Sequence, residues 1–409
     1  MHRITLILLL ALLLPDVYIY LVYIVKRTRS ILWRSAYWFP SAILVLLYLY
    51  FIYMTGDNAL SRHPQSIGRL AIAVMLFAVP KILFMLSSLL GILCRGISRC
   101  LSFLFFRTSF REPRFPFIVH RLPFTVLGLT LGIISFANIL YGALAGITHF
   151  EIKNVEYHST DLPKGFDGYR ILQVSDIHIG SWQDKKEAIQ RLVDMVNEQQ
   201  PDVIVFTGDL VNQQSHELDD FLSVLSEFHA PDGVYSILGN HDYGTYFHWK
   251  NRKDEEENLN YLLEQQKAMG WKLLNNEHAI LYHKGDSIAL IGVENDGEPP
   301  FSQHADLPRA MQGTEGLFKI LLSHNPTHWR REVLPDTDID LTLAGHTHAM
   351  QMEMFGHSLA SLKYPEWSGM YYDGKRALYV NIGIGYVGLP FRFGAWPEIT
   401  IIKLVSDNG

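Results

Sequence analysis

Five short blocks of the sequence place oxygen and nitrogen donors directly after apolar runs that are typical of β-strands. They are Ser175-Asp176-Ile177-His178, Gly208-Asp209, Gly239-Asn240-His241-Asp242, Ser323-His324-Asn325 and Gly345-His346-Thr347-His348. One such block occurs by chance in many chains, but five in succession at strand ends do not. Loops at the carboxyl ends of neighbouring strands converge in one crevice, where glycines allow close backbone approach. The blocks therefore predict a metal site at one edge of an α/β domain.

Seven side chains in these blocks carry atoms that bind metals, which is more than one ion with open positions needs. They are Asp176, His178, Asp209, Asn240, His324, His346 and His348. Carboxylate, imidazole and amide donors together suit Mn²⁺, Fe or Zn²⁺ better than an all-oxygen Ca²⁺ cage. We expect two divalent ions that share a carboxylate, with Mn²⁺ first and Fe, Zn²⁺ or Mg²⁺ as alternatives. Paired ions activate a bridging water and clamp phosphoryl oxygens, so the predicted chemistry is phosphoester hydrolysis by a metal-bridging hydroxide.

The pattern around the blocks predicts the elements that position them. Apolar runs at 169–174, 202–207 and 234–238 alternate with helical patterns near 184–199, 217–229 and 253–269. The later part of the chain is richer in strands, predicted at 279–283, 287–293, 318–323, 339–344, 378–382 and 398–404. We expect two packed sheets with helices outside them.

The ordered blocks resemble the calcineurin-like metallophosphoesterase superfamily. Its pattern is Asp-x-His, Gly-Asp, Gly-Asn-His-Asp/Glu, a separate His, and Gly-His-x-His, and the resemblance covers residues 165–409. The segments 169–176 (YRILQVSD) and 392–400 (RFGAWPEIT) are similar to the membrane-associated bacterial branch of YkuE-type enzymes. The resemblance implies an α/β fold with a four-layer double β-sandwich flanked by helices.

The resemblance also implies roles for individual residues. One metal would be held by Asp176, His178, Asp209 and His348, and the other by Asp209, Asn240, His324 and His346. Asp209 would then bridge the two ions. His241 would face the leaving group as a catalytic residue, with Asp242 holding its ring. Spacing alone leaves His241 open as a further ligand.

Two positions raise questions about the substrate. The branch continues its last motif as Gly-His-Thr-His-Gly-Gly-Gln, whereas this chain has Ala349 and Met350 in place of the two glycines. These side chains are expected to narrow the pocket or make it more apolar. Arg392 is a candidate contact for a substrate phosphate, or else it caps a strand end or pairs with an acid.

Composition divides the chain near Phe150 into two predicted domains, 1–150 and 151–409. The whole chain is 48% hydrophobic and 19% charged, which is apolar for a soluble enzyme. Residues 1–150 carry 14 Lys and Arg against 3 Asp and Glu, although the net charge of the whole chain is −6. The second domain is therefore acidic, which argues against nucleic-acid binding. Both cysteines, Cys94 and Cys100, lie in the first domain, so the second has no thiolate metal site.

Four apolar stretches in the first domain are long enough to span a bilayer, at about 4–25, 36–54, 70–93 and 122–147. Basic residues gather between the first and second stretches and between the third and fourth: Lys26, Arg27, Arg29, Arg34, Arg95, Arg99, Arg107, Arg111, Arg114 and Arg121. The second loop has only Arg62 and Arg69. The positive-inside rule then places the catalytic domain outside the cytoplasm. Within the stretches, Asp16 and Lys81 are expected to pair with each other, to line a water-filled seam, or to serve a function.

These features predict an integral membrane protein, in a bacterium of the inner membrane. The first hypothesis is a membrane-anchored dinuclear phosphoesterase that cleaves a phosphoester or pyrophosphate bond in a lipid-linked or envelope substrate. One alternative is a UDP-2,3-diacylglucosamine pyrophosphatase of lipid A synthesis, which requires a cytoplasmic catalytic domain. Another is a membrane sensor that binds metal or nucleotide without turnover. The sequence does not predict the oligomeric state.

Overall fold

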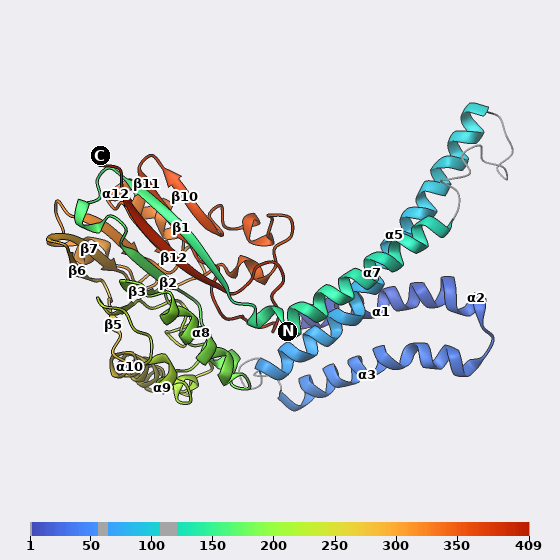
Figure 1. The fold of residues 1–409 in the computed structure, drawn as a ribbon. Helices are drawn as coiled ribbons and strands as arrows, with labels where there is room; N and C mark the ends of the chain where they lie inside the picture. The colour runs from blue at the N-terminus through green and yellow to red at the C-terminus, as the bar shows by residue number, and fades with distance from the viewer. Residues whose placement is uncertain (1, 56–63, 107–120, 409) are drawn as a thin grey trace. The chain divides into compact units, whose positions relative to one another are not determined.

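The computed structural model describes residues 2–55, 64–106 and 121–408, and it divides into two compact units, Met1–Leu144 and Ala145–Gly409 (Figure 1). The first unit is helical. Its elements are α1 (His2–Ile19), the π-helical η1 (Tyr20–Ile24), α2 (Val25–Arg27), α3 (Ile31–Thr55), α5 (Pro64–Phe106) and α7 (Arg121–Leu144). Within the described residues, four stretches are long and apolar enough to cross a membrane: Leu9–Arg27, Ile31–Phe51, Gln65–Leu101 and Leu122–Thr148. The prediction of four apolar helices that are long enough to span a membrane is confirmed. Arg62, Arg107, Arg111 and Arg114 lie outside the described residues.

Asp16 and Lys81 form an ion pair in the helical unit. Lys81 Nζ lies 2.6 Å from Asp16 Oδ1, and Asp16 is completely buried. The Tyr37 hydroxyl donates to Asp16 Oδ1 at 3.0 Å, and the Ser41 hydroxyl donates to Asp16 Oδ2. Lys81 Nζ also donates to Ser41 Oγ at 3.0 Å. The cluster thus joins α1, α3 and α5, which confirms the pairing alternative.

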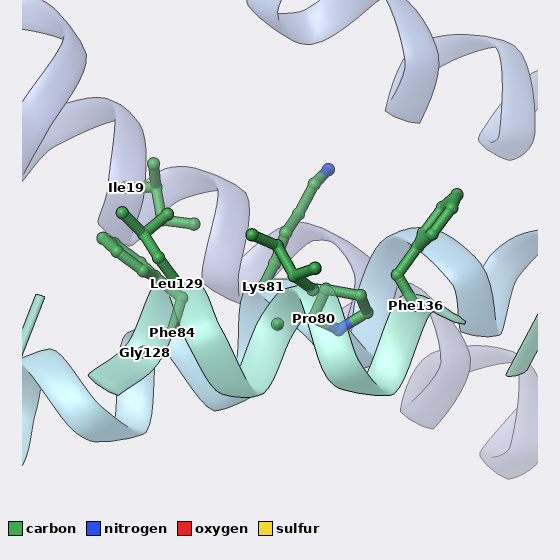
Figure 2. A pocket seen from close by; sticks show the side chains of 9 residues that line it. Ile19, Pro80, Lys81, Phe84, Gly128, Leu129 and Phe136 are labelled. Carbon is green, nitrogen blue, oxygen red and sulfur yellow. The ribbon is translucent and has the colours of Figure 1, made fainter. Parts of the chain in front are cut away.

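Lys81 also lines an open cavity of about 400 Å³ between α1, α5 and α7 (Figure 2). The surrounding side chains are otherwise apolar and include Ile19, Phe84, Leu129 and Phe136. The lysine is the one ionisable residue among those that line this cavity. Its partner Asp16 compensates its charge, as a charge at membrane depth requires.

Two six-stranded sheets form the second unit. In order across the first sheet the strands are β1 (Glu151–Ser159), β12 (Glu398–Ser406), β2 (Arg170–Val174), β3 (Val203–Phe206), β4 (Val234–Ser236) and β5 (Lys272–Leu273). The second sheet has β10 (Gly369–Asp373), β11 (Arg376–Val380), β9 (Leu341–Ala344), β8 (Phe318–Leu322), β7 (Asp286–Gly292) and β6 (Glu277–His283). Strands β2, β3 and β4 are parallel neighbours, and so are β8 and β9.

Alternating side chains divide the second unit into four layers. Ile171 of β2 faces the core between the sheets, where it joins residues of the second sheet such as Ile320. Leu172, the next residue, faces a separate core that includes side chains of α8 (Lys186–Glu198) and α10 (Arg252–Ala268). Helix α11 (Leu307–Met311) and the segment Trp329–Asp336 cover the outer face of the second sheet. The predicted helix–sheet–sheet–helix architecture is confirmed.

The sequence interpretation of the second unit was wrong for one helix, and it missed three strands. The helix expected at 217–229 is instead a 3-10 turn, η6 (Ser215–Leu218), followed by one helical turn, α9 (Leu222–Leu225). The Glu217 side chain binds backbone N–H groups of residues 212–214, and this contact fixes the turn. The interpretation also missed β5, β10 and β1. The sequence of β1, EIKNVEYHS, is polar and largely accessible. That strand forms by pairing with β12.

Candidate metal centre

The predicted metal-binding side chains follow the carboxyl ends of adjacent strands in both sheets. Asp176 and His178 follow β2, Asp209 follows β3, Asn240 follows β4, His324 follows β8, and His346 and His348 follow β9. Parallel neighbours end at the same edge of a sheet, so their loops meet there. The architecture thus brings donors from widely separated parts of the chain to one place.

One half of the site contains Asp176, His178 and His348. Nε2 of His348 lies 3.2 Å from Asp176 Oδ1 and 3.1 Å from Nε2 of His178. All three residues are buried, and their donor atoms lie within 4.8 Å of one another. The Ser175 hydroxyl and the backbone N–H of His346 donate to the Asp176 carboxylate, which fixes its orientation.

The other half contains His324 and His346, and Asp209 lies between the two halves. Nε2 of His324 is 3.2 Å from Nδ1 of His346. Oδ2 of Asp209 lies 3.3 Å from His324 Nε2 and 3.6 Å from His178 Nε2. One carboxylate oxygen therefore faces an imidazole from each half, which is the position that a shared ligand needs.

The hydrogen bonds of the rings favour a cation between them and Asp209. Nδ1 of His178 donates to the Val211 carbonyl at 3.2 Å, and Nδ1 of His324 donates to the Thr207 carbonyl at 2.8 Å. In a neutral ring, each Nε2 then presents a lone pair to the Asp209 carboxylate. Two acceptors face each other favourably only when a proton or a metal ion lies between them.

The pKa directions agree with this arrangement. Burial lowers the pKa of His346 to about 3 and also lowers the pKa values of His178 and His348. Burial lowers the pKa of His324 as well, but the carboxylates of Asp209 and Asp176 outweigh it and raise that pKa to about 10. Neutral imidazole is the metal-binding form, and at His324 a metal would take the place of a proton.

Asn240 supplies a further sign that the site accepts a cation. It is 4% exposed, and its Nδ2 donates to the Tyr246 hydroxyl at 2.9 Å. Its Oδ1 is buried and has no hydrogen-bond partner. A buried acceptor without a partner is costly, so a metal bound at this oxygen would remove the penalty.

The local backbone also shows that the site is specialised. Asp176, His178, Asp209, His346 and His348 all have positive φ, between 46° and 75°. Such conformations cost non-glycine residues about 1–3 kcal/mol each and gather at functional sites. The neighbouring glycines are required sterically, since a Cβ at Gly239 would overlap Asp209 Oδ1 and a Cβ at Gly345 would overlap Ser175 Oγ.

His241 lies beside the donors, but its ring is not held as expected. Nδ1 of His241 donates to the Asn212 carbonyl at 2.6 Å, and its backbone N–H donates to Asp209 Oδ1 at 2.8 Å. A ring nitrogen of His241 lies within 4.8 Å of the possible metal-ligand atoms of His178 and Asp209. With Nδ1 donating, Nε2 is the nitrogen that is able to exchange a proton with a substrate.

The expectation that Asp242 holds the His241 ring is therefore wrong. The Asp242 carboxylate accepts four backbone N–H bonds instead, from Gly239, Asp209, Leu210 and Val211, at 2.8 to 3.2 Å. Asp242 is completely buried, and burial together with the nearby Asp209 carboxylate raises its pKa to about 7. Its side chain joins the loops after β3 and β4, so it fixes the site through the backbone.

Arg392 is likewise placed differently from the expected substrate contact. It is completely buried, and its guanidinium donates to the carbonyls of Gly385, Ile382 and Ala395 at 2.8 to 3.1 Å. Nη2 also donates to Nδ1 of His348 at 2.8 Å. Burial lowers its pKa to about 10. The arginine therefore fixes the ring of the candidate ligand His348, and the proton of the neutral ring then lies on Nε2, 3.2 Å from Asp176 Oδ1. Its hydrogen bonds go to protein atoms, not to the solvent side of the site.

Comparison with known proteins agrees with this geometry. Residues 169–350 match the family described as Calcineurin-like phosphoesterase, and residues 2–147 match Probable Calcineurin-like phosphoesterase, transmembrane domain. "Uncharacterized metallophosphoesterase YkuE" of Bacillus subtilis is 32% identical over 262 residues, which are 61% of this chain and 84% of that protein. The chain belongs to the calcineurin-like phosphoesterase family.

Other relatives of this phosphoesterase come from animals and bacteria. A "Transmembrane protein with metallophosphoesterase domain" from Danio rerio is 33% identical over 290 residues, which are 68% of this chain and 62% of that protein. The chain thus spans less than two thirds of that relative. An "Uncharacterized metallophosphoesterase" of Helicobacter pylori is 28% identical over 350 residues, which are 84% of this chain and 88% of that protein. The family and the membrane domain are confirmed, whereas a bacterial source remains a prediction.

The sequence analysis missed several residues around the phosphoesterase site. The Tyr364 hydroxyl lies 3.0 Å from Nε2 of His346, and the Phe301 ring packs edge-on against His346 with centroids 4.5 Å apart. The Tyr246 ring lies 4.3 Å from that of His241. Lys363 Nζ lies 5.2 Å from the Phe301 ring centroid. Tyr364 and Phe301 thus contact His346, and Tyr246 lies beside His241. No pattern in a single sequence distinguishes these three from other loop aromatics.

Glu217 is a further residue that the sequence did not single out. Its carboxylate accepts backbone N–H bonds from Asn212 at 2.6 Å, Gln213 at 3.1 Å and Gln214 at 3.2 Å. Burial raises its pKa to about 7, although these bonds act in the opposite direction. Since the Asn212 carbonyl holds the His241 ring, Glu217 positions that ring through one peptide group.

Proposed function

We propose that this protein is a dinuclear metal phosphoesterase that its helical unit holds in a membrane. The observation that carries the proposal is the Asp209 carboxylate, with Oδ2 at 3.3 Å from His324 and 3.6 Å from His178. The unpartnered Asn240 oxygen supports the same conclusion. When bound, two divalent ions would supply the Lewis acidity that phosphoester hydrolysis requires. Mn²⁺ is the first candidate, followed by Fe, Zn²⁺ and Mg²⁺, because the donor set mixes nitrogen and oxygen.

The ligand sets follow the two halves of the site. Asp176, His178, Asp209 and His348 would hold one ion, and Asp209, Asn240, His324 and His346 would hold the other. His241 would donate a proton from Nε2 to the leaving oxygen, because Nδ1 is committed to Asn212. Arg392 keeps His348 oriented, and Asp242 keeps the Asp209 loop in place.

The membrane unit supports a substrate class. An enzyme confined to a bilayer meets amphiphilic substrates at high local concentration. We therefore propose a phosphoester or pyrophosphate bond in a lipid-linked or envelope compound. The distribution of basic residues favours a catalytic unit outside the cytoplasm. A reporter fused after Gly409 tests this orientation. A cytoplasmic signal would refute it and would favour the pyrophosphatase alternative, whose nucleotide-linked substrate is cytosolic.

The activity is tested with the full-length protein in nanodiscs. It is stripped of metal, resupplied separately with Mn²⁺, Mg²⁺ or Zn²⁺, and assayed on a phosphomonoester, a phosphodiester and UDP-diacylglucosamine. Asp209→Asn is the matched control, because it keeps the shape and removes the shared charge. We expect metal-dependent turnover that the control loses. A folded, metal-loaded protein without turnover on any of these compounds would contradict the proposal and favour a binding role.

A further inference from the structure

Six apolar side chains are exposed in one short segment of the catalytic unit, residues 350–362, which we call the apolar loop. They are Met350, Met352, Met354, Phe355, Leu359 and Leu362. Phe355 is 94% exposed and Leu362 is 84% exposed. Glu353, which is half-buried, is the only acidic residue of the loop, and the loop has no Lys or Arg. Large apolar side chains that are exposed together in one segment mark a contact with another apolar body.

Backbone hydrogen bonds and left-handed conformations in the apolar loop hold these side chains in exposed positions. Met354 and His357 exchange two backbone hydrogen bonds, at 2.9 and 3.0 Å, so that Phe355 and Gly356 form the tip of a tight hairpin. Phe355 has a φ of 54° and Met350 has a φ of 46°. Glycine or asparagine usually occupies such positions. A left-handed backbone conformation is unfavourable for residues other than glycine, and exposure of large apolar side chains to water is unfavourable as well. That the loop has both features points to a functional contact.

Both ends of the apolar loop are attached to the metal centre. The loop begins two residues after His348 and ends two residues before Tyr364, whose hydroxyl contacts His346. The Ser358 hydroxyl donates to the carbonyl of Ala349, which closes the base of the loop. A surface that binds the apolar loop therefore lies next to the metal-binding histidines.

Contacts inside the catalytic unit link the apolar loop to the end of the last apolar span. Gln351 accepts a bond from the Val387 N–H at 2.5 Å and donates to the Leu389 carbonyl at 3.1 Å. The N–H of Glu353 donates to the Phe393 carbonyl at 2.9 Å. This places the loop on the segment 387–393.

The same segment reaches the first residues of the unit. Gly146 packs so closely on the Arg392 carbonyl that a Cβ would overlap it, and the rings of His149 and Trp396 stack with centroids 4.8 Å apart. Gly146 and Thr148 belong to the end of the candidate span Leu122–Thr148. The apolar loop is therefore fixed close to the point where the chain leaves the apolar span.

We propose that the apolar loop inserts into the interface of the bilayer that holds the protein, so that the metal centre opens beside lipid headgroups. The occupant is the lipid surface, because the exposed side chains are apolar and the loop is fixed near the end of a span. Methionine, leucine and phenylalanine are side chains that enter the boundary between headgroups and acyl chains. The inference deepens the proposed function by naming its substrate class, a phosphate in the headgroup region of an amphiphile. The lipid contact itself does not depend on hydrolysis.

The test measures lipid contact directly in full-length protein reconstituted in phosphatidylcholine–phosphatidylglycerol vesicles. Cys94 and Cys100 are replaced by Ser, and an NBD label is attached after Phe355→Cys or, separately, Leu362→Cys. The matched control is Tyr282→Cys, since Tyr282 is 75% exposed and lies on β6, at the opposite sheet edge from β10. Emission and quenching by nitroxide-labelled lipids are compared with quenching by aqueous iodide.

We expect the two loop labels to emit at shorter wavelength than the control and to be quenched at least twofold more by nitroxide lipids. We expect iodide to quench mainly the Tyr282→Cys label. Equal iodide access at all three positions would overturn the proposal. A blue shift that depends on protein concentration, without lipid quenching, would also overturn it, because a second copy would then cover the loop. Hydrolysis is measured separately, so failure of the catalytic proposal leaves this result intact.

Discussion

The ion pair between Asp16 and Lys81 yields a prediction that separates a structural role from a functional one. We consider Lys81→Met, Asp16→Asn and the double variant. Asparagine keeps one oxygen, which is able to accept from Tyr37, while its Nδ2 faces the Ser41 hydroxyl as a donor. Methionine keeps the length of the lysine stem. If the ion pair only stabilises the helical unit, the double variant should regain the free energy of unfolding that each single variant loses.

The expected change in the free energy of unfolding follows from the burial of Asp16 and its distance from Lys81. Charges 2.6 Å apart attract by about 6 kcal/mol at an effective dielectric constant of about 20, before the cost of desolvation. Lys81→Met leaves the fully buried Asp16 unpaired, and breaking a buried pair in this way costs about 3–5 kcal/mol. Asp16→Asn should cost less, about 2–3 kcal/mol, because the Ser41 hydroxyl and the asparagine oxygen still accept hydrogen bonds from the Lys81 ammonium.

The double variant should lie within about 1 kcal/mol of the wild type, which gives a coupling energy of at least about 4 kcal/mol. The assay is reversible unfolding in bicelles, followed by phosphoester hydrolysis in the same lipid. Additive losses in the double variant would refute the reasoning about the pair. A stable double variant that has lost hydrolysis would refute the structural role and support a sensing or transport function.

Three further predictions concern the catalytic unit. His241→Asn should lower kcat by about 10²–10⁴-fold while bound metal, measured by elemental analysis, is unchanged; loss of metal would instead make His241 a ligand. Met350→Gly should stabilise the unit to chemical unfolding by about 1 kcal/mol because φ is 46°, whereas Met352→Gly, on extended backbone of similar exposure, should destabilise it; a loss in both would contradict the strain. Burial raises the pKa of Asp340 to about 6, so its ionisation destabilises the fold as pH rises from about 4 through about 6. Asp340→Asn should therefore match the wild type near pH 4 and exceed it by about 1–2 kcal/mol at pH 8, after allowance for partial exposure; a constant difference would exclude this carboxyl.

The sequence predicted the parts of the site that depend on strand order. Apolar runs marked β2, β3, β8 and β9, and parallel neighbours bring their following loops together wherever the sheet forms. The placement of His178 and His324 around Asp209 agrees with that reasoning, although their ligand roles remain proposals. The four apolar helices were predictable for a similar reason, because length and hydropathy decide them.

Contacts to backbone atoms could not be predicted. The carbonyl that holds His241 belongs to Asn212, and its direction depends on a turn fixed by Glu217. Arg392 was a candidate phosphate contact because guanidinium suits phosphate, beside the alternatives of capping a strand end or pairing with an acid, and three carbonyls and His348 take its donors. Side-chain type gives the chemistry that a residue is able to perform, whereas tertiary structure determines its partner.

The pairing of β1 with β12 has a consequence for synthesis at the membrane. Strand β1 follows the last apolar span, and its register runs from Glu151 with Glu398 to Ser159 with Ser406. Strand β12 lies between β1 and β2, so β1 has no neighbour, and β2 has only β3, until residues 398–406 have left the ribosome. The spans can enter the bilayer early in translation, while the catalytic unit stays open beside it. Folding of this sheet is therefore a late, post-insertion event, and exposed strand edges at the membrane would need protection in that interval.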